Sequence, residues 1–320
     1  MNSSINNTSL LSHTIAFYNT ENLFDIYDSK KTSDSDLTPT ADKRWTAKRY
    51  SEKLNNIGFT ISKIGKKETK KHPALIGLAE VENGSVINDL IATSHLKDFN
   101  YNYIHYNSKD ERGIDVALIF DETLFKIESS KPYSIELFNN SGKVDYTRDI
   151  LLVTGMLEGD KIHFILNHWS SRRAGTKETE HKRLAASNKV GEIISTIKSA
   201  DTHSKIIIMG DFNDEPSSFN VKRLVDGFQL FNPMETLRTY SRGTTTHNKQ
   251  WNVFDQIFFT DSLLAPKNKS FEFELADIFD AQFLKNSKGK FKGAPFRTYV
   301  GKKYHGGYSD HFPVYITLKK

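Results

Sequence analysis

The sequence predicts an α/β protein in which two mixed β-sheets pack together with helices outside. Near the N-terminus, strand-like apolar runs at 14–18 and 74–79 lie on either side of a segment, Leu54 to Ile64, whose apolar residues recur at helical spacing. Later, several strand-like segments follow one another with turn signals and no helix between them, which is typical of antiparallel sheet. A chain with both patterns does not fit a simple doubly wound sheet, but it fits two packed mixed sheets.

The other elements follow from the same periodicities. A second helix is expected to begin near Ser85, its N-cap, and a third to extend from Glu178 to Lys198. The Lys- and Gly-rich stretch from Leu284 to Tyr304 predicts a long surface loop. Further strands are expected over 101–106, 114–120, 124–128, 150–157, 161–167, 205–209, 252–260, 271–278 and 313–318, with turns at Asn139-Asn140-Ser141-Gly142 and Glu158-Gly159-Asp160.

No change in composition marks a linker, and no internal repeat is present. We expect residues 1–12 to be disordered or extended and residues 13–320 to form a single domain large enough to bury a stable core. Residues 1–7 lack the basic start and apolar core of a secretory signal, and no apolar run reaches membrane-spanning length. We therefore expect no integral membrane association and a cytoplasmic protein, or a secreted one if a signal peptide has been removed.

Composition restricts the chemistry. The chain contains no cysteine, which excludes disulfides, thiolate metal sites and cysteine nucleophiles. Any metal must be held by oxygen and imidazole, which favours magnesium, manganese or calcium. The net charge of +5 suits a protein that binds polyanions, although a solvated lysine-rich surface accounts for most of the excess.

Four predicted strands end or begin in polar turns that carry acidic residues. Glu80 follows the strand at 74–79, for example, and Asp310 and His311 directly precede the closing strand. An α/β scaffold gathers catalytic groups and ligands at one mouth by placing them in such turns, so the pattern predicts a functional site. The side chains in these turns are Asn19, Glu21, Glu80, Asp211, Asn213, Asp310 and His311.

Six motifs, which include these turns, carry a resemblance to a known family. In order they are Tyr18-Asn19-Thr20-Glu21-Asn22, Leu78-Ala79-Glu80, Asn167-His168-Trp169, Gly210-Asp211-Phe212-Asn213, Phe254-Asp255-Gln256-Ile257 and Ser309-Asp310-His311. Over nearly its whole length the chain resembles the endonuclease/exonuclease/phosphatase superfamily, which includes deoxyribonuclease I, exonuclease III and the inositol-phosphate and sphingomyelin phosphodiesterases. The resemblance implies a four-layer α/β/β/α sandwich and one catalytic domain over 13–320.

The resemblance also implies a metal site. Glu80 resembles the family's main metal carboxylate. Asp310, Glu21 and Asn19 would complete an oxygen shell suited to a hard cation, which we expect to be Mg²⁺, with Mn²⁺ or Ca²⁺ as alternatives.

Catalytic roles are implied for four further residues. Hydrolysis of a phosphoester needs an activated water and stabilisation of charge on the phosphoryl oxygens. Asp211 resembles the residue that orients or deprotonates the water, and Asn213 the amide that holds substrate or nucleophile. His311 resembles the imidazole that contacts the scissile phosphate, and Asp255 the carboxylate that fixes its tautomer.

The last implied residues surround a second imidazole. His168 resembles a catalytic histidine of the deoxyribonuclease I and sphingomyelinase branches, and Asp115 is the candidate for its supporting partner. Arg172 and Arg173 resemble the basic loop of bacterial nuclease-like members and are expected to contact phosphates at the rim of the cleft. Arg148 is a further candidate phosphate clamp.

We therefore predict a divalent-metal-dependent phosphodiester hydrolase, a nuclease that cuts nucleic acid internally by metal-assisted attack of water, acting as a monomer. The alternative is a phosphatase or phosphodiesterase of a small or lipid substrate, such as an inositol phosphate or sphingomyelin, because the same catalytic set serves both and the fold does not choose. A third interpretation, a binding module that has lost its chemistry, is disfavoured because every core catalytic residue type is present.

Overall fold

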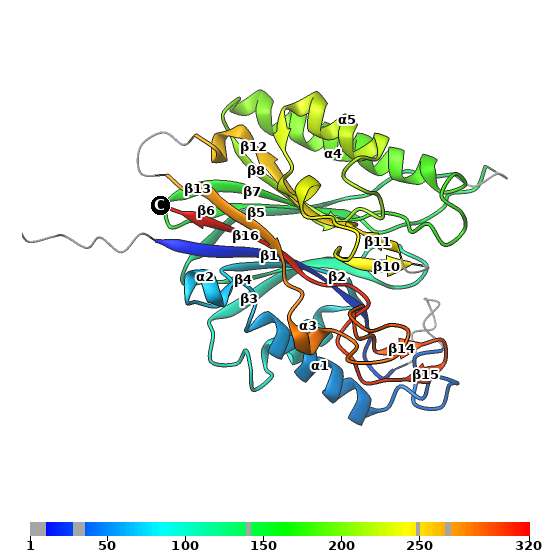
Figure 1. Cartoon of the computed structure of the whole chain (residues 1–320). Coiled ribbons are helices and arrows are strands. Elements are labelled where there is room, and N and C mark those ends of the chain that lie inside the picture. Colours follow the sequence, from blue (N-terminus) through cyan, green and yellow to red (C-terminus); the bar gives the residue numbers. More distant parts are fainter. Residues whose placement is uncertain (1–10, 28–35, 139–141, 248–249, 266–269) are drawn as a thin grey trace, which may run out of the picture.

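The structure, a computed structural model, describes residues 11–27, 36–138, 142–247, 250–265 and 270–320. Two six-stranded sheets face each other, and helices cover both outer faces (Figure 1). This arrangement confirms the predicted α/β/β/α sandwich. Residues 1–10 of the predicted N-terminal segment and 139–141 of the predicted turn lie outside the described residues.

The first sheet has the strand order β13-β16-β1-β2-β4-β3. Only β1 and β2 are parallel neighbours, and the helix α1 between them covers the outer face together with α3 (Figure 1). The bounds are β1 (Ser12–Leu23), α1 (Ala47–Ile61), α2 (Lys66–Thr69), β2 (Leu75–Val81), α3 (Gly84–Ile91), β3 (Tyr101–His105), β4 (Asp115–Asp121), β13 (Glu272–Ile278) and β16 (Val314–Lys319).

The second sheet has the order β5-β6-β7-β8-β12-β9. Here β7 and β8 are parallel, and α4 and α5 cover the outer face (Figure 1). Among the described residues, no helix has the length and apolar character needed to cross a membrane. The bounds are β5 (Phe125–Tyr133), β6 (Ile150–Leu157), β7 (Asp160–His168), α4 (Glu180–Ala200), β8 (Lys205–Asp211), α5 (Phe219–Phe228), β9 (Leu230–Phe231) and β12 (Asp255–Thr260).

Several short elements complete the fold and correct the predicted boundaries. The predicted strand over 252–260 is interrupted at 253–254, and the predicted surface loop over 284–304 contains two short antiparallel strands, β14 (Tyr299–Val300) and β15 (Lys303–Tyr304). The cap of α3 is Asn83 rather than Ser85, because the Asn83 side chain accepts the Val86 amide. The short elements are η1 (Pro233–Thr236), β10 (Thr245–His247), β11 (Gln250–Asn252), η2 (Asp261–Leu263), η3 (Gln282–Leu284), β14 (Tyr299–Val300) and β15 (Lys303–Tyr304).

The helix α5 is not among the elements predicted from the sequence. It buries only Asn220, Val221 and Leu224, while Phe219 at its start is 65% exposed. Val221, Leu224, Val225 and Phe228 nevertheless recur at i, i+3, i+4 and i+7, so the helical period was present in the sequence.

Strand alternation builds the core on both sides of the first sheet. In β1, Ile15 and Phe17 point between the sheets, whereas Ala16 and Tyr18 point toward the helices. Each fully buried large apolar side chain contributes about 1.5–3 kcal/mol, so both faces of this strand stabilise the sandwich. A strand buried on both faces reads as a continuous apolar run, as the sequence does here.

Strand direction brings the predicted turns to one edge of the sandwich. The parallel pair β1 and β2 ends beside the parallel pair β7 and β8, and the antiparallel strands β12 and β16 begin at that same edge. Gly210 allows the two parallel strands of the second sheet to approach, since a Cβ there would lie 2.4 Å from the carbonyl oxygen of Asn167. The polar turns therefore meet although they are far apart in sequence.

Candidate active site

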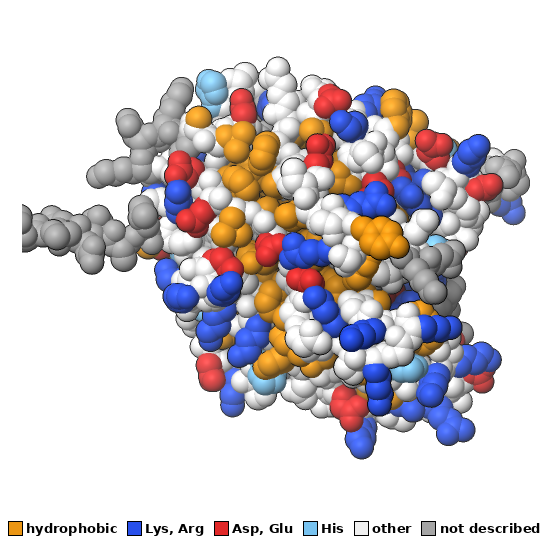
Figure 2. Space-filling view, in the orientation of Figure 1, with side chains coloured by type: hydrophobic (Ala, Val, Ile, Leu, Met, Phe, Trp, Pro, Cys, Tyr) orange, Lys and Arg blue, Asp and Glu red, His pale blue; other side chains and the backbone are white. Residues whose placement is uncertain are grey.

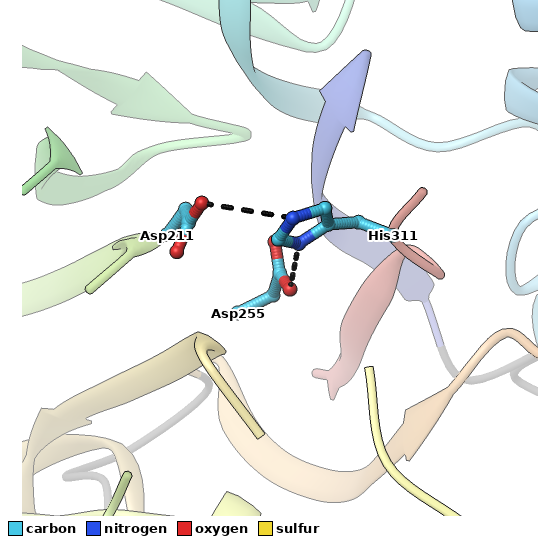
Figure 3. Close-up of side chains that lie close together, drawn as sticks. All are labelled: Asp211, Asp255 and His311. Atoms are coloured by element: carbon cyan, nitrogen blue, oxygen red, sulfur yellow. Dashed lines mark hydrogen bonds and ion pairs between the residues drawn. The ribbon is translucent and has the colours of Figure 1, made fainter. Parts of the chain in front are cut away.

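A histidine between two aspartates forms the centre of the site. His311 Nδ1 lies 2.7 Å from Asp255 Oδ2, and His311 Nε2 lies 4.0 Å from Asp211 Oδ2 (Figure 3). Asp255 is fully buried, whereas the side chain of His311 keeps 11% of its exposure. The Asp255 carboxylate thus holds the ring so that Nε2 faces Asp211.

The surrounding backbone fixes this geometry across both sheets. Asp255 and Asp211 are directly opposite residues of β12 and β8, so their side chains leave the same edge. The Ser309 hydroxyl donates to the Asn19 carbonyl at 2.7 Å and accepts the His311 amide at 3.1 Å. The turn that carries His311 is therefore tied to the end of β1.

Burial and charge shift the pKa values of this pair in useful directions. Burial raises the pKa of Asp211 to about 7, and the neighbouring Asp255 carboxylate adds to that effect while His311 opposes it. Burial by itself lowers the pKa of His311, but the three neighbouring carboxylates, Asp255 foremost, outweigh burial and hold the pKa well above its ordinary value. At neutral pH the site thus holds a charged imidazole beside a carboxylate that can gain and lose a proton.

The turn after Asp211 has a strained backbone, and hydrogen bonds from three groups hold it in place. Asn213 has a left-handed backbone at φ 49°, and its amide donates to Asp211 Oδ1 at 2.9 Å. The other oxygen of Asp211 accepts the Asn19 side-chain amide at 3.0 Å. The Asn213 side chain donates to the Trp169 carbonyl at 3.0 Å, which links this turn to the end of β7. Left-handed backbone at non-glycine residues concentrates at functional sites, where the surroundings maintain it.

Glu80 is aimed into the site by a bulge. Its φ is 62°, and the pairing of β2 with both neighbours shifts register at this position. Glu80 Oε2 accepts the Asn22 amide at 2.9 Å, and Glu80 Oε1 lies 3.9 Å from His168 Nε2 and 3.7 Å from Arg112. A regular strand would have turned the Glu80 side chain to one face of the sheet, so the bulge accounts for its direction.

His168 lies between Glu80 and Asp211 as an uncharged ring. Its Nε2 is 3.7 Å from Asp211 Oδ2. Burial lowers the pKa of His168 well below its ordinary value, and the nearby Arg148 and Arg112 add to this effect. Its Nδ1 is buried without a hydrogen-bond partner among the described residues.

The predicted pairing of Asp115 with His168 is wrong. Asp115 Oδ1 accepts the Ser108 amide at 3.1 Å, and Asp115 Oδ2 lies 3.4 Å from His105 Nε2. Asp115 begins β4 in the first sheet, whereas His168 ends β7 in the second. Asp115 therefore supports the loop before its own strand.

Arg297, within the predicted surface loop, is a site residue that the sequence did not reveal. Its Nη2 donates to Asp310 Oδ2 at 2.7 Å, and its Nε lies 3.4 Å from Glu21 Oε1. Burial raises the pKa of Asp310, but the surrounding cations, His311 foremost, hold it below its usual range. In the sequence, Arg297 differs from the other basic residues of this long loop only in being an arginine among lysines.

Glu21, predicted as a metal ligand, is used to anchor that loop. Its Oε2 accepts the Thr298 amide at 2.6 Å and lies 3.9 Å from the fully buried Nζ of Lys53, while its Oε1 faces Arg297. Asn19 likewise has a local role, because its Oδ1 accepts the Glu21 amide at 3.0 Å. Glu80 and Asp310, by contrast, each keep one oxygen, Oε1 and Oδ1, that accepts no hydrogen bond among the described residues.

The three predicted phosphate-binding arginines have different surroundings. Arg172 is engaged: Nε donates to the Asn213 carbonyl at 2.7 Å and Nη2 to Asp214 Oδ1 at 2.5 Å. Arg148 is buried 3.5 Å from Asp110. Arg173 is exposed, and its guanidinium makes no hydrogen bond or ion pair within the described part of the chain. Of these three arginines, only Arg173 is both exposed and without a partner among the described residues. Arg172 instead holds the turn at Asn213.

Replacing Arg172 by methionine is expected to lower the free energy of unfolding by about 2 kcal/mol, because it removes two charge-assisted hydrogen bonds. Urea denaturation measures this loss. Arg223→Met, at an exposed position of α5, is the matched control: among the described residues its guanidinium bonds only to the exposed Asn188 side chain, so the loss should stay below about 0.5 kcal/mol. Equal midpoints for wild type and Arg172→Met would show that the Asn213 turn is held without this side chain.

The donor set fits a hard divalent cation. Asp211, Asp255 and His311 each offer one ligand atom, and these atoms lie within 4.8 Å of one another. Asp310 Oδ1 is 3.8 Å from His311 Nε2, and Glu80 flanks the other side. Carboxylate oxygens are the ligands that magnesium and manganese prefer, so Glu80 and Asp310 are the fitting donors, whereas the charged ring of His311 is not.

This chain belongs to the endonuclease/exonuclease/phosphatase family, whose sequence profile matches residues 14–320. Enzymes of this family hydrolyse phosphoester bonds, and the chain is a phosphoester hydrolase. A comparison with curated proteins gave no match.

Solved structures share the fold at low sequence identity. An endonuclease/exonuclease/phosphatase family protein from Bacteroides thetaiotaomicron is 17% identical, with 97% of this chain and 98% of that chain covered and a TM-score of 0.60. A mannosyl-6-phosphatase of the same organism is 17% identical, with 96% and 99% covered and a TM-score of 0.58. TDP2 from D. rerio, complexed with a single-strand DNA product, is 14% identical, with 97% and 99% covered and a TM-score of 0.54. These similarities support the fold and leave the substrate open.

Proposed function

We propose that the protein is a divalent-metal-dependent phosphodiester hydrolase that acts on nucleic acid, as an endonuclease. The observation that carries the proposal is the arrangement of His311 between Asp255 and Asp211. Attack of water on a phosphate needs a base that takes the proton of the water and a donor that faces the phosphoryl oxygens. The carboxylate of Asp211, with a pKa of about 7, suits the first role and the charged imidazole of His311 the second.

In this mechanism Asp211 accepts the proton of the attacking water. His311, held by Asp255 and charged at neutral pH, stabilises the negative charge that develops on the phosphoryl oxygens through its Nε2–H. Asn213 and the uncharged His168 hold the water and the phosphate from the second sheet. Each role is assigned from the direction in which the side chain points and from its protonation state at neutral pH.

Glu80 and Asp310 are the residues proposed to hold the metal, with Asn19 nearby. Each of the two carboxylates keeps one oxygen without a hydrogen bond among the described residues, whereas both oxygens of Glu21 are engaged. A bound divalent cation supplies charge neutralisation at the phosphate.

Nucleic acid is the proposed substrate because the chain is basic overall and Arg173 is exposed beside the site. The similarity of fold to a TDP2 complexed with single-strand DNA product is compatible with it. The similarity to a mannosyl-6-phosphatase supports the second candidate, a phosphatase of a small phosphoester. We propose a monomer with one catalytic domain over 13–320.

A substrate panel with magnesium tests the proposal. The panel contains plasmid DNA, single-stranded DNA, RNA, sphingomyelin, inositol phosphates, a sugar monophosphate and bis(p-nitrophenyl) phosphate. Cleavage of a nucleic acid at a higher kcat/KM than any small ester supports the nuclease. A preference for the sugar or inositol phosphate would replace it by the second candidate, and full activity in excess chelator would overturn the metal-dependent mechanism.

Replacing Glu80 by glutamine is expected to raise the magnesium concentration needed for half-maximal activity by about tenfold or more, because a carboxylate ligand becomes a neutral amide. A magnesium titration of bis(p-nitrophenyl) phosphate hydrolysis measures the shift. Glu192→Gln, at an exposed position of α4, is the matched control. An unchanged titration for Glu80→Gln would remove Glu80 from the metal site.

A further inference from the structure

A cationic pocket lies beside the candidate active site. It has a volume of about 180 Å³, and Lys43, Arg173 and Arg297 all line it. Pockets that hold whole small ligands measure roughly 300–1,000 Å³, so this one suits a single group of a larger molecule. Three cations around a space of this size suit an anion.

The walls of the pocket are held by specific contacts. The Tyr299 hydroxyl donates to the Lys43 carbonyl at 3.0 Å, and the Trp45 indole donates to the Phe24 carbonyl at 3.0 Å. Lys43 Nζ lies 6.0 Å from the centre of the Tyr299 ring. The pocket is thus a built feature of the fold, formed where the segment before α1 packs against β14.

The balance of charge in the pocket is positive. Glu21 is the carboxylate in its lining, and both Glu21 oxygens are engaged by Arg297 and the Thr298 amide. Lys43 pairs with Asp36, a half-exposed carboxylate, at 2.6 Å. The exposed guanidinium of Arg173 makes no such pair among the described residues, so it is available to a ligand. On the face drawn in Figure 2, Lys and Arg side chains also gather over β14 and β15.

The pocket shares a wall with the catalytic centre. Arg297 reaches from the pocket to Asp310, which lies 3.8 Å from His311 Nε2. On the other side, the amide of Asn22, another wall residue, holds Glu80. Only the side chain of Arg297 therefore separates a group in the pocket from Asp310 and His311. Such a group lies next to the phosphate that is hydrolysed at His311.

We propose that this pocket binds a second phosphate group of the substrate, next to the phosphate that is hydrolysed. This inference rests on the proposed function, because it takes the cluster around His311 as the site of hydrolysis. Arginine and lysine are the side chains that recognise phosphate, and arginine does so with paired donors. Either the next nucleotide of a nucleic acid or a small bisphosphate could supply the group.

Matched pairs of substrates test the proposal. One arm compares a dinucleotide without terminal phosphate to the same dinucleotide with a 5′ or a 3′ phosphate, and the other compares a sugar monophosphate to its bisphosphate. In wild type we expect the second phosphate to raise kcat/KM by about tenfold in at least one arm. Arg173→Gln and Lys43→Gln should each reduce this ratio to about threefold or less, whereas Arg223→Gln on α5 should retain it.

Direct binding separates this proposal from the proposed function. In the His311→Ala background, calorimetry should show that adenosine 3′,5′-bisphosphate binds more tightly than adenosine 5′-monophosphate, and that Arg173→Gln removes the difference. Absence of hydrolysis in wild type would overturn the proposed function, and this binding measurement would still decide on the pocket. Two results would overturn the second-phosphate site. One is equal binding of the two nucleotides together with equal kcat/KM for the substrates of each pair. The other is a higher kcat/KM for the substrate with the second phosphate that both pocket variants retain.

Discussion

Replacing Asp211 by asparagine is expected to lower kcat by about 10³-fold, because a carboxamide cannot accept the proton of the attacking water. The side chains have the same shape, and the Asn213 amide can still bond to the retained oxygen, so the fold should persist. Hydrolysis of bis(p-nitrophenyl) phosphate at saturating magnesium measures the loss. Asp226→Asn, at an exposed position of α5, is the matched control.

The pH dependence of the wild type provides a second measurement of the same role. Burial raises the pKa of Asp211 to about 7, and the active form is the deprotonated one. Activity should therefore be low in acid and rise between about pH 6 and 8. A profile that is flat across this range, or an Asp211→Asn variant with wild-type kcat, would exclude Asp211 as the base.

Replacing His311 by alanine is expected to lower kcat by about 10³-fold, because the donor that faces the developing phosphoryl charge is removed. Since Asp211 and His311 act on one transition state, the double variant should be about as slow as the slower single variant. His203→Ala, at an exposed position, controls for the loss of a ring. Losses that multiply in the double variant would show that the two residues act independently.

Asp255 should act through His311 and leave its own signature. Its carboxylate is foremost among the three that raise the pKa of His311. In Asp255→Asn the imidazole should lose its proton at lower pH, so the fall of activity in alkaline solution should begin earlier than in wild type. A variant that is merely destabilised would lose activity without shifting this limb of the profile.

The sequence was sufficient to predict the layers and the edge at which the site lies. Runs such as Ile206 to Met209 show buried strands directly, and the position of Asp211 after such a run assigns it to a strand end. Acidic turns at strand ends, such as those at Glu80 and Asp211, were expected to meet because α/β scaffolds gather functional groups at one mouth. The predicted neighbours Asp255 and His311, for instance, lie 2.7 Å apart.

The sequence was not sufficient to predict how the charged side chains pair. Glu21 has the residue type and position of a metal ligand, yet Arg297, which is 276 residues away, and the Thr298 amide take its oxygens. Arg172 lies in a segment whose composition is typical of a solvated loop, yet its side chain donates to the Asn213 carbonyl and holds that turn. The left-handed backbone at Glu80 depends on a register shift with two neighbouring strands.

The sequence by itself therefore determined the class of fold, the order of its elements and the residue types available for phosphoester chemistry, because burial and strand or helix periodicity are written locally along the chain. Only the tertiary structure decided that Arg173 stays free while Arg172 does not, that Asp115 serves His105, and that a cationic pocket adjoins the centre. The physical reason is distance. Ion pairs and hydrogen bonds form within about 4 Å, and a chain of this length brings many candidate partners to that range only once its layers have packed.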